Sequence, residues 1–112
     1  MRSDRDRLLD ILEAIERIGT QASRGREVFE RDELVRTFIV HHLQIIGEAA
    51  AKVSQGLCRG HPEIAWQQIV AMRHILVHDY FRVDENEVWT TVERDLPSLK
   101  TAIEKLLGDL AQ

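Results

Sequence analysis

Arg73, His78 and Tyr80 are the residues of this chain whose types and spacing could do chemistry. They lie in the run RHILVHDY, where the histidine comes five positions after the arginine and the tyrosine seven positions after it. Arginine binds phosphate through a planar fork of N–H donors, and histidine can take or give a proton near neutral pH. Residues 75–77 between them are apolar. The run therefore combines phosphate binding and proton transfer, which together could cleave a phosphodiester bond without a metal.

An α-helix would place these side chains on neighbouring faces. Residues five apart differ by about 140° around a helix axis, so Arg73 and His78 lie on flanking lines. Arg73 and Tyr80 share one stripe, and His74 and His78, at i and i+4, share the next. A two-fold axis could bring both sets from two subunits into one cleft. We therefore expect a homodimer.

The pattern leads to the hypothesis of a metal-independent ribonuclease. His78 would act as general base on a ribose 2′-hydroxyl, or as general acid on the leaving oxygen. Arg73 would hold the scissile phosphate and stabilise the charge that develops on its oxygens. His74 would orient a phosphate or shuttle a proton, and Tyr80 would stack on the substrate or hydrogen-bond to it.

A purely structural interpretation of the same residues remains open. Arg73 would then pair with an acidic side chain, and His78 would simply end a helix. Glu48 is a candidate partner for Arg73, because it is an acid among the small residues of the segment IGEAA.

Metal binding is a rival chemical interpretation. His74 and His78 have the spacing of two zinc ligands on a helix, and His41 and His42 are available elsewhere. The general-base glutamate of the His-Glu-x-x-His proteases is missing between them, however. A structural zinc site also favours several cysteines, and this chain has one. We expect neither a metal nor another cofactor.

Composition points to one soluble globular domain over residues 1–112. The chain is 44% hydrophobic and 30% charged, with a net charge of −4 that argues against sequence-independent binding of duplex nucleic acid. The single Cys58 cannot form an internal disulfide, which favours a cytoplasmic setting. We see no signal peptide, and no apolar run approaches the roughly 18 residues that would span a membrane.

Apolar residues recur at helical spacing nearly throughout, which predicts an all-α, up-and-down bundle of four to five helices. The first helix is expected over residues 3–22, with Ser3 and Asp6 as its cap. The second is expected over residues 30–55 and the third from His61-Pro62-Glu63 to about residue 80. Asp84 and Glu87 resemble a capping box for the last helix, which Pro97 should kink or split.

The second predicted helix carries two adjacent apolar stripes. One contains Leu34, Phe38, His41, Ile45 and Ala49, and the other contains Val35, Ile39, His42, Ile46, Ala50 and Val53. An outer helix of a small bundle usually needs only one such stripe. The helix is therefore covered on two sides, either by a second subunit or as the central helix of the monomer. In both cases we expect the two histidines to be buried core residues.

Taken together, these features resemble the HEPN-domain toxins of the HepT type. The resemblance is carried by Arg73-x4-His78-x-Tyr80, by the preceding segment IGEAA, by Val88-Trp89 and by Asp95-Leu96-Pro97. It extends over nearly the full chain, and the polar His74 after the motif arginine also fits it.

The resemblance implies properties that the spacing does not. Such proteins are all-helical homodimers with a composite cleft, and many are metal-independent endoribonucleases whose active-site residues are the motif arginine and histidine. HepT-type toxins pair with a minimal nucleotidyltransferase antitoxin, which transfers AMP from ATP to the motif tyrosine, here Tyr80. The added phosphate would block the cleft beside Arg73 and His78. The alternative is a non-catalytic helical partner that binds or regulates a nucleotidyltransferase.

Overall fold

The computed structural model describes residues 2–78 and 84–111, with the side chains of residues 74–78 left out of the description. All regular structure in these two ranges is helical, which confirms the predicted all-α class. The elements in chain order are α1 (Asp4–Ala22), α2 (Arg26–Arg31), α3 (Glu33–Ala51), α4 (Gln55–Gly60), α5 (Trp66–His78), α6 (Glu85–Thr90), the π-helical turn η1 (Thr91–Asp95) and α7 (Leu96–Leu110).

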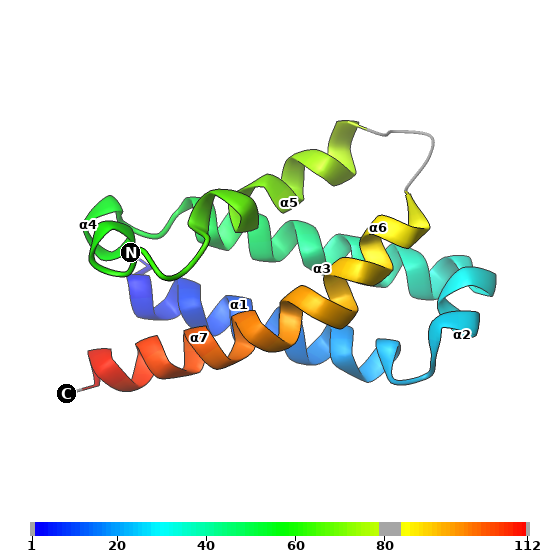
Figure 1. Cartoon of the computed structure of the whole chain (residues 1–112), viewed down its shortest axis with the longest axis horizontal. Coiled ribbons are helices and arrows are strands. Elements are labelled where there is room, and N and C mark those ends of the chain that lie inside the picture. Colours follow the sequence, from blue (N-terminus) through cyan, green and yellow to red (C-terminus); the bar gives the residue numbers. More distant parts are fainter. Residues whose placement is uncertain (1, 79–83, 112) are drawn as a thin grey trace.

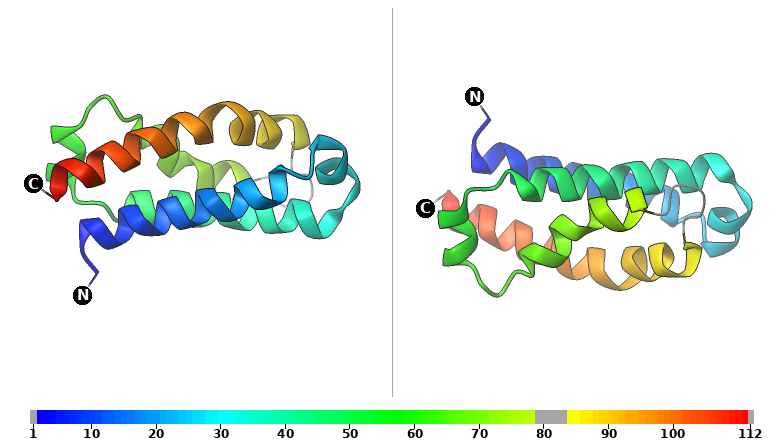
Figure 2. Two further views of the ribbon diagram at one scale, coloured as in Figure 1. Left: turned by 90° about the horizontal axis from the view of Figure 1, so that it is seen from below. Right: turned by 90° about the horizontal axis from the view of Figure 1, so that it is seen from above.

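Four long helices form the bundle, and α3 lies between two of them. It packs against α1 on one side and α5 on the other, while α7 packs against α1 (Figure 1). The two termini lie at the same end of the bundle, as both views in Figure 2 show. At the opposite end Phe29 of α2 packs on Trp89 of α6, with ring centroids 5.2 Å apart. Both side chains are buried, so this aromatic pair anchors the core at that end.

The first predicted helix is confirmed, and its cap has the expected chemistry. The backbone N–H of Asp6 donates to the Ser3 hydroxyl at 3.1 Å, and the Ser3 N–H donates to the Asp6 carboxylate at 3.0 Å. The hydrogen bond from the Ser3 backbone N–H is the main cause that lowers the pKa of the Asp6 carboxyl, since it favours the charged form, and a hydrogen bond with the Ser3 side chain adds to it. The same helix is tied to the start of α4, where the N–H and hydroxyl of Ser54 donate to Asp4 at 2.9 and 2.6 Å.

The prediction of one helix over residues 30–55 is wrong, because Asp32 breaks it. Asp32 is extended, and its carboxylate accepts hydrogen bonds from the N–H groups of Leu34 and Val35 as the N-cap of α3. Arg36 donates to the carbonyl oxygens of Phe29, at 3.2 Å, and Glu30 in the last turn of α2. The free N–H groups at the start of α3 and the free carbonyl groups at the end of α2 thus both have side-chain hydrogen-bond partners. The far boundary also differs, since α3 ends at Ala51 and Gly56 lies inside the separate helix α4.

The third helix begins later than predicted. Residues 61–65 form turns before α5, in which the Ile64 N–H donates to the carbonyl of His61 at 3.2 Å. The Trp66 indole N–H donates to the same carbonyl at 3.1 Å, and the Ile64 side chain is buried. From Pro62 alone we expected the first position of a helix here. The burial of Ile64 and the hydrogen bond of the Trp66 indole favour a turn instead.

For the last helix, the predicted N-cap and the predicted split near Pro97 are confirmed, whereas the capping box is only half formed: no hydrogen bond from the Asp84 N–H to the Glu87 carboxylate is present among the described residues. Asp84 is the N-cap of α6, and its carboxylate accepts from the Glu87 N–H at 3.1 Å. Pro97 lies in the first turn of α7, directly after the π-helical turn η1. Proline lacks an N–H and clashes with the carbonyl one turn back, so the α-helical ladder is interrupted at this point.

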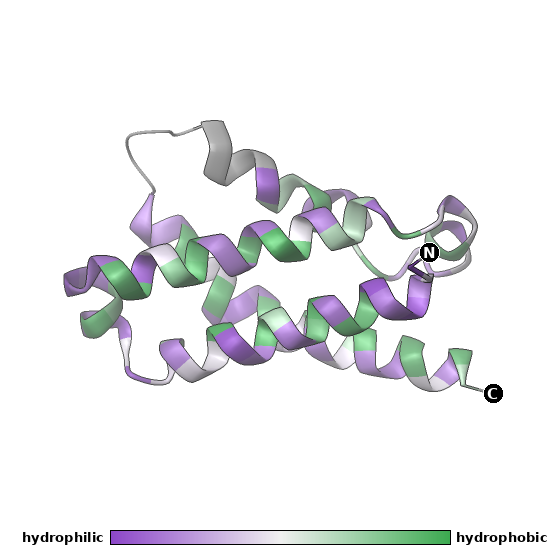
Figure 3. Ribbon diagram, turned by 180° about the vertical axis from the view of Figure 1, so that it is seen from behind, coloured by the Kyte–Doolittle hydropathy of each residue, from purple (hydrophilic) through white to green (hydrophobic). Residues whose placement is uncertain are grey.

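The two stripes of α3 have different environments. The stripe that contains Ile39 and Ile46 is buried between α1 and α5, as expected for a central helix. The other stripe is only partly covered, and Leu34 at its start is 80% exposed. Figure 3 shows hydrophobic bands on α3 where this helix faces the viewer. The central position of α3 therefore accounts for the buried stripe only. We call the other one the open stripe, because the monomer covers it only in part; it consists of Leu34, Phe38, His41, Ile45 and Ala49.

No helix within the described ranges is long and apolar enough to cross a bilayer.

The break at Asp32 can be tested by substitution. Asp32→Ala removes the cap of α3 and should lower the free energy of unfolding by about 1 kcal/mol. Asp32→Asn keeps an oxygen acceptor and should stay close to the wild type. Urea denaturation followed by circular dichroism measures both, and equal stability of the alanine and asparagine variants would contradict the capping role.

Candidate functional site

Arg73 lies in the middle of α5, on the side that meets α3. Its side chain is 33% exposed, so the guanidinium reaches solvent while the base of the side chain is covered. The Nε atom is buried and has no hydrogen-bond partner among the described residues. The protein thus encloses the side chain of Arg73 up to its Nε atom, and the part beyond Nε is accessible to solvent.

Glu48 of α3 is the partner of Arg73, as the structural interpretation of the sequence predicted. The Nη1 group of Arg73 donates to Oε1 of Glu48 at 3.2 Å, and Glu48 is 52% exposed. An ion pair this open to water contributes about 0–1 kcal/mol. A phosphate could therefore displace the carboxylate, or share the guanidinium with it, at little cost. The ion pair is compatible with both the structural and the catalytic interpretation.

Gly47 is a residue whose role sequence reasoning missed. A Cβ atom at this position would lie 2.8 Å from the backbone nitrogen of Arg73, 3.1 Å from its Cβ and 3.2 Å from the carbonyl oxygen of Val70. A side chain of any size would therefore push α5 away from α3 at Arg73. The signal in the sequence was a glycine inside a helical pattern, which costs about 1 kcal/mol relative to alanine and so calls for a reason.

The rest of the motif is described only in part. The helical backbone of α5 continues to His78, so the assumed helical spacing between Arg73 and His78 holds. The side chains of His74 and His78 are not described, and Tyr80 lies outside the described residues altogether. The expected contacts of these three side chains therefore remain predictions.

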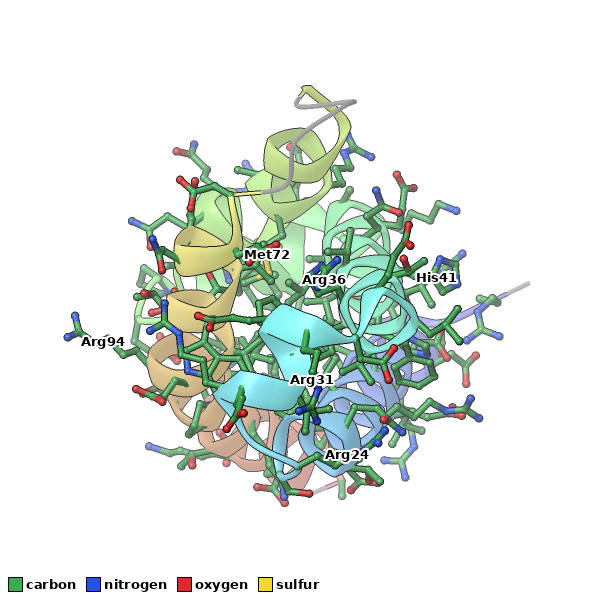
Figure 4. The ribbon with its side chains drawn as sticks, turned by 90° about the vertical axis from the view of Figure 1, so that its right-hand side faces the viewer. Arg24, Arg31, Arg36, His41, Met72 and Arg94 are labelled. Carbon is green, nitrogen blue, oxygen red and sulfur yellow. The ribbon has the colours of Figure 1, made fainter. Side chains whose placement is uncertain are left out.

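The two histidines of α3 differ from each other. His42 is buried, its ring stacks on Phe38 with centroids 4.1 Å apart, and its Nδ1 lies 2.8 Å from the Phe38 carbonyl oxygen. The prediction of a satisfied core histidine is thus confirmed for His42. It is wrong for His41, which is exposed on the outer side of α3, as Figure 4 shows. Neighbouring helical positions differ by about 100° around the axis, so one can face the core while the next faces water.

Two hollows flank α5 and α3. One of about 670 Å³ lies between α5 and the α6–α7 segment, where Met72 faces it (Figure 4), and Arg73 does not line it. The other, of about 330 Å³, lies between α1 and α3 and is lined in part by His41, Ile45 and Glu48. The second hollow is lined both by residues of the open stripe of α3 and by Glu48, the residue that pairs with Arg73.

The two candidate zinc ligands of α5, His74 and His78, have side chains outside the described part of the structure. Within the two described ranges no three histidine, cysteine or acidic side chains are grouped as a metal site would need.

Burial raises the pKa of the Cys58 thiol, and the nearby Asp4 carboxylate adds to the effect. A raised pKa reduces the fraction of the reactive thiolate, so the structure gives this cysteine no activation as a nucleophile.

Comparison with known proteins places this geometry in context. Residues 11–106 match the model of a family described as HepT-like ribonucleases. The chain is 42% identical over 109 residues to a protein of Thermococcus cleftensis named "Probable ribonuclease HepT", with 94% of this chain and 96% of that protein covered. It is 32% identical to "Putative RNase MJ1216" of Methanocaldococcus jannaschii, with 92% of this chain and 86% of that protein covered. No solved structure matches the chain.

Proposed function

The chain belongs to the HepT-like ribonuclease family, and on this premise we propose that it is a metal-independent endoribonuclease with Arg73 and His78 at its active site. The observation that carries the proposal is the setting of Arg73. Its guanidinium lies on an open surface and is engaged through one nitrogen by a half-exposed carboxylate. A phosphate of an extended RNA strand can reach such a group without entering a closed pocket.

Cleavage of RNA by this route needs two groups of the protein that act at the same phosphodiester bond. One binds the phosphate and the other transfers protons. Arg73 binds the scissile phosphate and stabilises the charge that develops on its oxygens. His78, five residues along α5, removes the proton of the ribose 2′-hydroxyl or protonates the 5′-oxygen that leaves. Attack by the 2′-oxygen on phosphorus breaks the bond to that 5′-oxygen and leaves a 2′,3′-cyclic phosphate. No step requires a metal.

Substitution of the two residues tests the proposal. Arg73→Ala and His78→Ala should each lower RNA cleavage by about 100-fold or more without unfolding the chain. Cleavage should persist in excess EDTA and leave cyclic-phosphate ends. Arg94→Ala is the matched control, because Arg94 is exposed in η1 and points away from the bundle (Figure 4). Activity that survives both motif substitutions, or that EDTA removes, would favour the non-catalytic alternative.

The proposal includes a homodimer that uses the open stripe of α3. Leu34 is 80% exposed, and partly covered Phe38 and Ile45 continue the stripe toward the hollow beside Glu48. An exposed apolar stripe of this kind supports an interface between proteins. A second subunit here would lie next to Arg73, in agreement with a cleft to which both copies contribute.

The dimer can be tested without disturbing the core. Leu34→Lys should weaken the dimer about tenfold or more, since it places a charge in the interface. Leu110→Lys is the control, because Leu110 is an exposed leucine near the end of α7. Light scattering at micromolar concentration measures both. A wild-type chain that is strictly monomeric under these conditions would contradict the proposed dimer.

We also propose that the chain is the toxin of a toxin–antitoxin module and that its antitoxin is a minimal nucleotidyltransferase. The enzyme would transfer AMP from ATP to the hydroxyl of Tyr80, with release of pyrophosphate. Tyr80 is the single tyrosine of the chain and comes two positions after His78. The new phosphate would lie on the stripe of Arg73 and bind its guanidinium in place of the substrate.

Incubation with a cognate nucleotidyltransferase, ATP and magnesium should add the mass of one or more AMP groups and inhibit cleavage. Tyr80→Phe should accept no AMP and resist neutralisation. Mass spectrometry that finds unmodified Tyr80 in a fully neutralised complex would contradict this mechanism, and inhibition would then come from coverage of the site by the antitoxin.

A further inference from the structure

Gly47 and Glu48 are consecutive residues of α3 that contact opposite ends of Arg73. Gly47 lies against the backbone of Arg73, where a Cβ would come within 2.8 Å of the nitrogen. Glu48 contacts the guanidinium at 3.2 Å. The backbone position and the direction of the side chain are thus both constrained from the same turn of α3.

The contact at Gly47 is specific to this position of the fold. The nearest atoms to its hypothetical Cβ are two atoms of Arg73 and the Val70 carbonyl oxygen, and two of these three are backbone atoms that no rotamer change can move. A Cβ at Gly19 in α1 or at Gly108 in α7 would meet nothing within 4 Å. Helical glycines elsewhere in the chain therefore have no comparable steric role.

The contact at Glu48 leaves most of the guanidinium available. Arginine has five N–H donors in a rigid plane, and Glu48 accepts from Nη1 alone among the described contacts. The carboxylate fixes the direction of a long, flexible side chain, and the remaining donors on Nη1 and Nη2 can bind phosphate oxygens. The ion pair therefore restricts the conformations of the arginine without saturating it.

We propose that Gly47 and Glu48 are positioning residues for Arg73 in phosphate recognition. Gly47 sets how closely α5 approaches α3, and Glu48 sets the orientation of the guanidinium plane. The inference rests on the proposed ribonuclease function. Its physical basis is that a displacement of about 1 Å at a catalytic group can lower the rate by about 100-fold. Neither residue touches the reacting atoms, so both act through Arg73.

Gly47→Ala, with Gly19→Ala as its control, tests the first half. Both glycines lie in helices of 19 residues, but only the Gly47 substitution meets the backbone of Arg73. Gly47→Ala should lower kcat for RNA cleavage by about 10- to 100-fold while KM changes less. Gly19→Ala should leave both constants unchanged. The ¹⁵N NMR signal of the Arg73 Nε–H group, assigned through its loss in Arg73→Lys, should shift in Gly47→Ala alone.

Glu48→Gln, with Glu30→Gln as its control, tests the second half. Glu30 forms a comparable ion pair with Arg26 at 2.8 Å and is 47% exposed. Glu48→Gln should lower kcat by about twofold to fivefold and shift the Arg73 Nε–H signal, as expected for loss of one exposed ion pair. Glu30→Gln should do neither.

The outcomes separate this inference from the proposed function. If Arg73→Ala cleaves RNA as well as the wild type, the proposed function fails, and the NMR signal alone decides whether the two residues position Arg73. If Arg73→Ala is inactive but Gly47→Ala and Glu48→Gln behave like their controls in kcat and in the NMR signal, the positioning inference is overturned. Should Gly47→Ala fail to fold by circular dichroism, the Glu48→Gln result decides.

Discussion

The candidate site depends on the close contact between α3 and α5 at Gly47. At this point the backbone nitrogen of Arg73 lies 2.8 Å from where the Cβ of any larger residue would stand, which is too close for a Cβ. On its other side α3 packs against α1, and Arg36 near its start joins α2 and pairs with Glu85 of α6 at 3.5 Å. The helix that carries the motif arginine is thus docked on the helix that organises the bundle. An error in this one contact would displace the arginine with its whole segment.

In the free protein the guanidinium of Arg73 is held by its ion pair with Glu48. A buried ion pair would be costly to break, because each charge would be left without water or partner. This pair is partly exposed, so its net contribution is small and a phosphate can compete for the guanidinium. The same contact therefore holds the arginine in the free protein and leaves the other donors of Nη1 and Nη2 open to the substrate. The open stripe of α3 lies beside it, and a second subunit there would add a wall to an otherwise open surface.

Much of this arrangement could be predicted from the sequence, and the failures have local causes. Helical periodicity gave the all-α class, and the caps at Ser3 and Asp84 followed from residue types alone. The break at Asp32 was missed, although aspartate is a favoured N-cap residue and both apolar stripes begin only after it, at Leu34 and Val35. No glycine or proline lies between residues 26 and 46 to mark the end of a helix. The Glu48–Arg73 pair could be anticipated from charge. The role of Gly47 could not, because it depends on which residue of another helix lies opposite.

A crystal structure with a short RNA that carries a 2′-deoxy nucleotide at the cleavage site would test the central claim most directly. Without the 2′-hydroxyl the strand cannot be cut by the proposed route, so the bound phosphate can be observed. The account predicts this phosphate within about 3 Å of the Arg73 guanidinium, with the His78 ring beside the 2′ position or the leaving 5′-oxygen. RNA bound at another surface, with Arg73 still paired to Glu48 and no phosphate near it, would contradict the account.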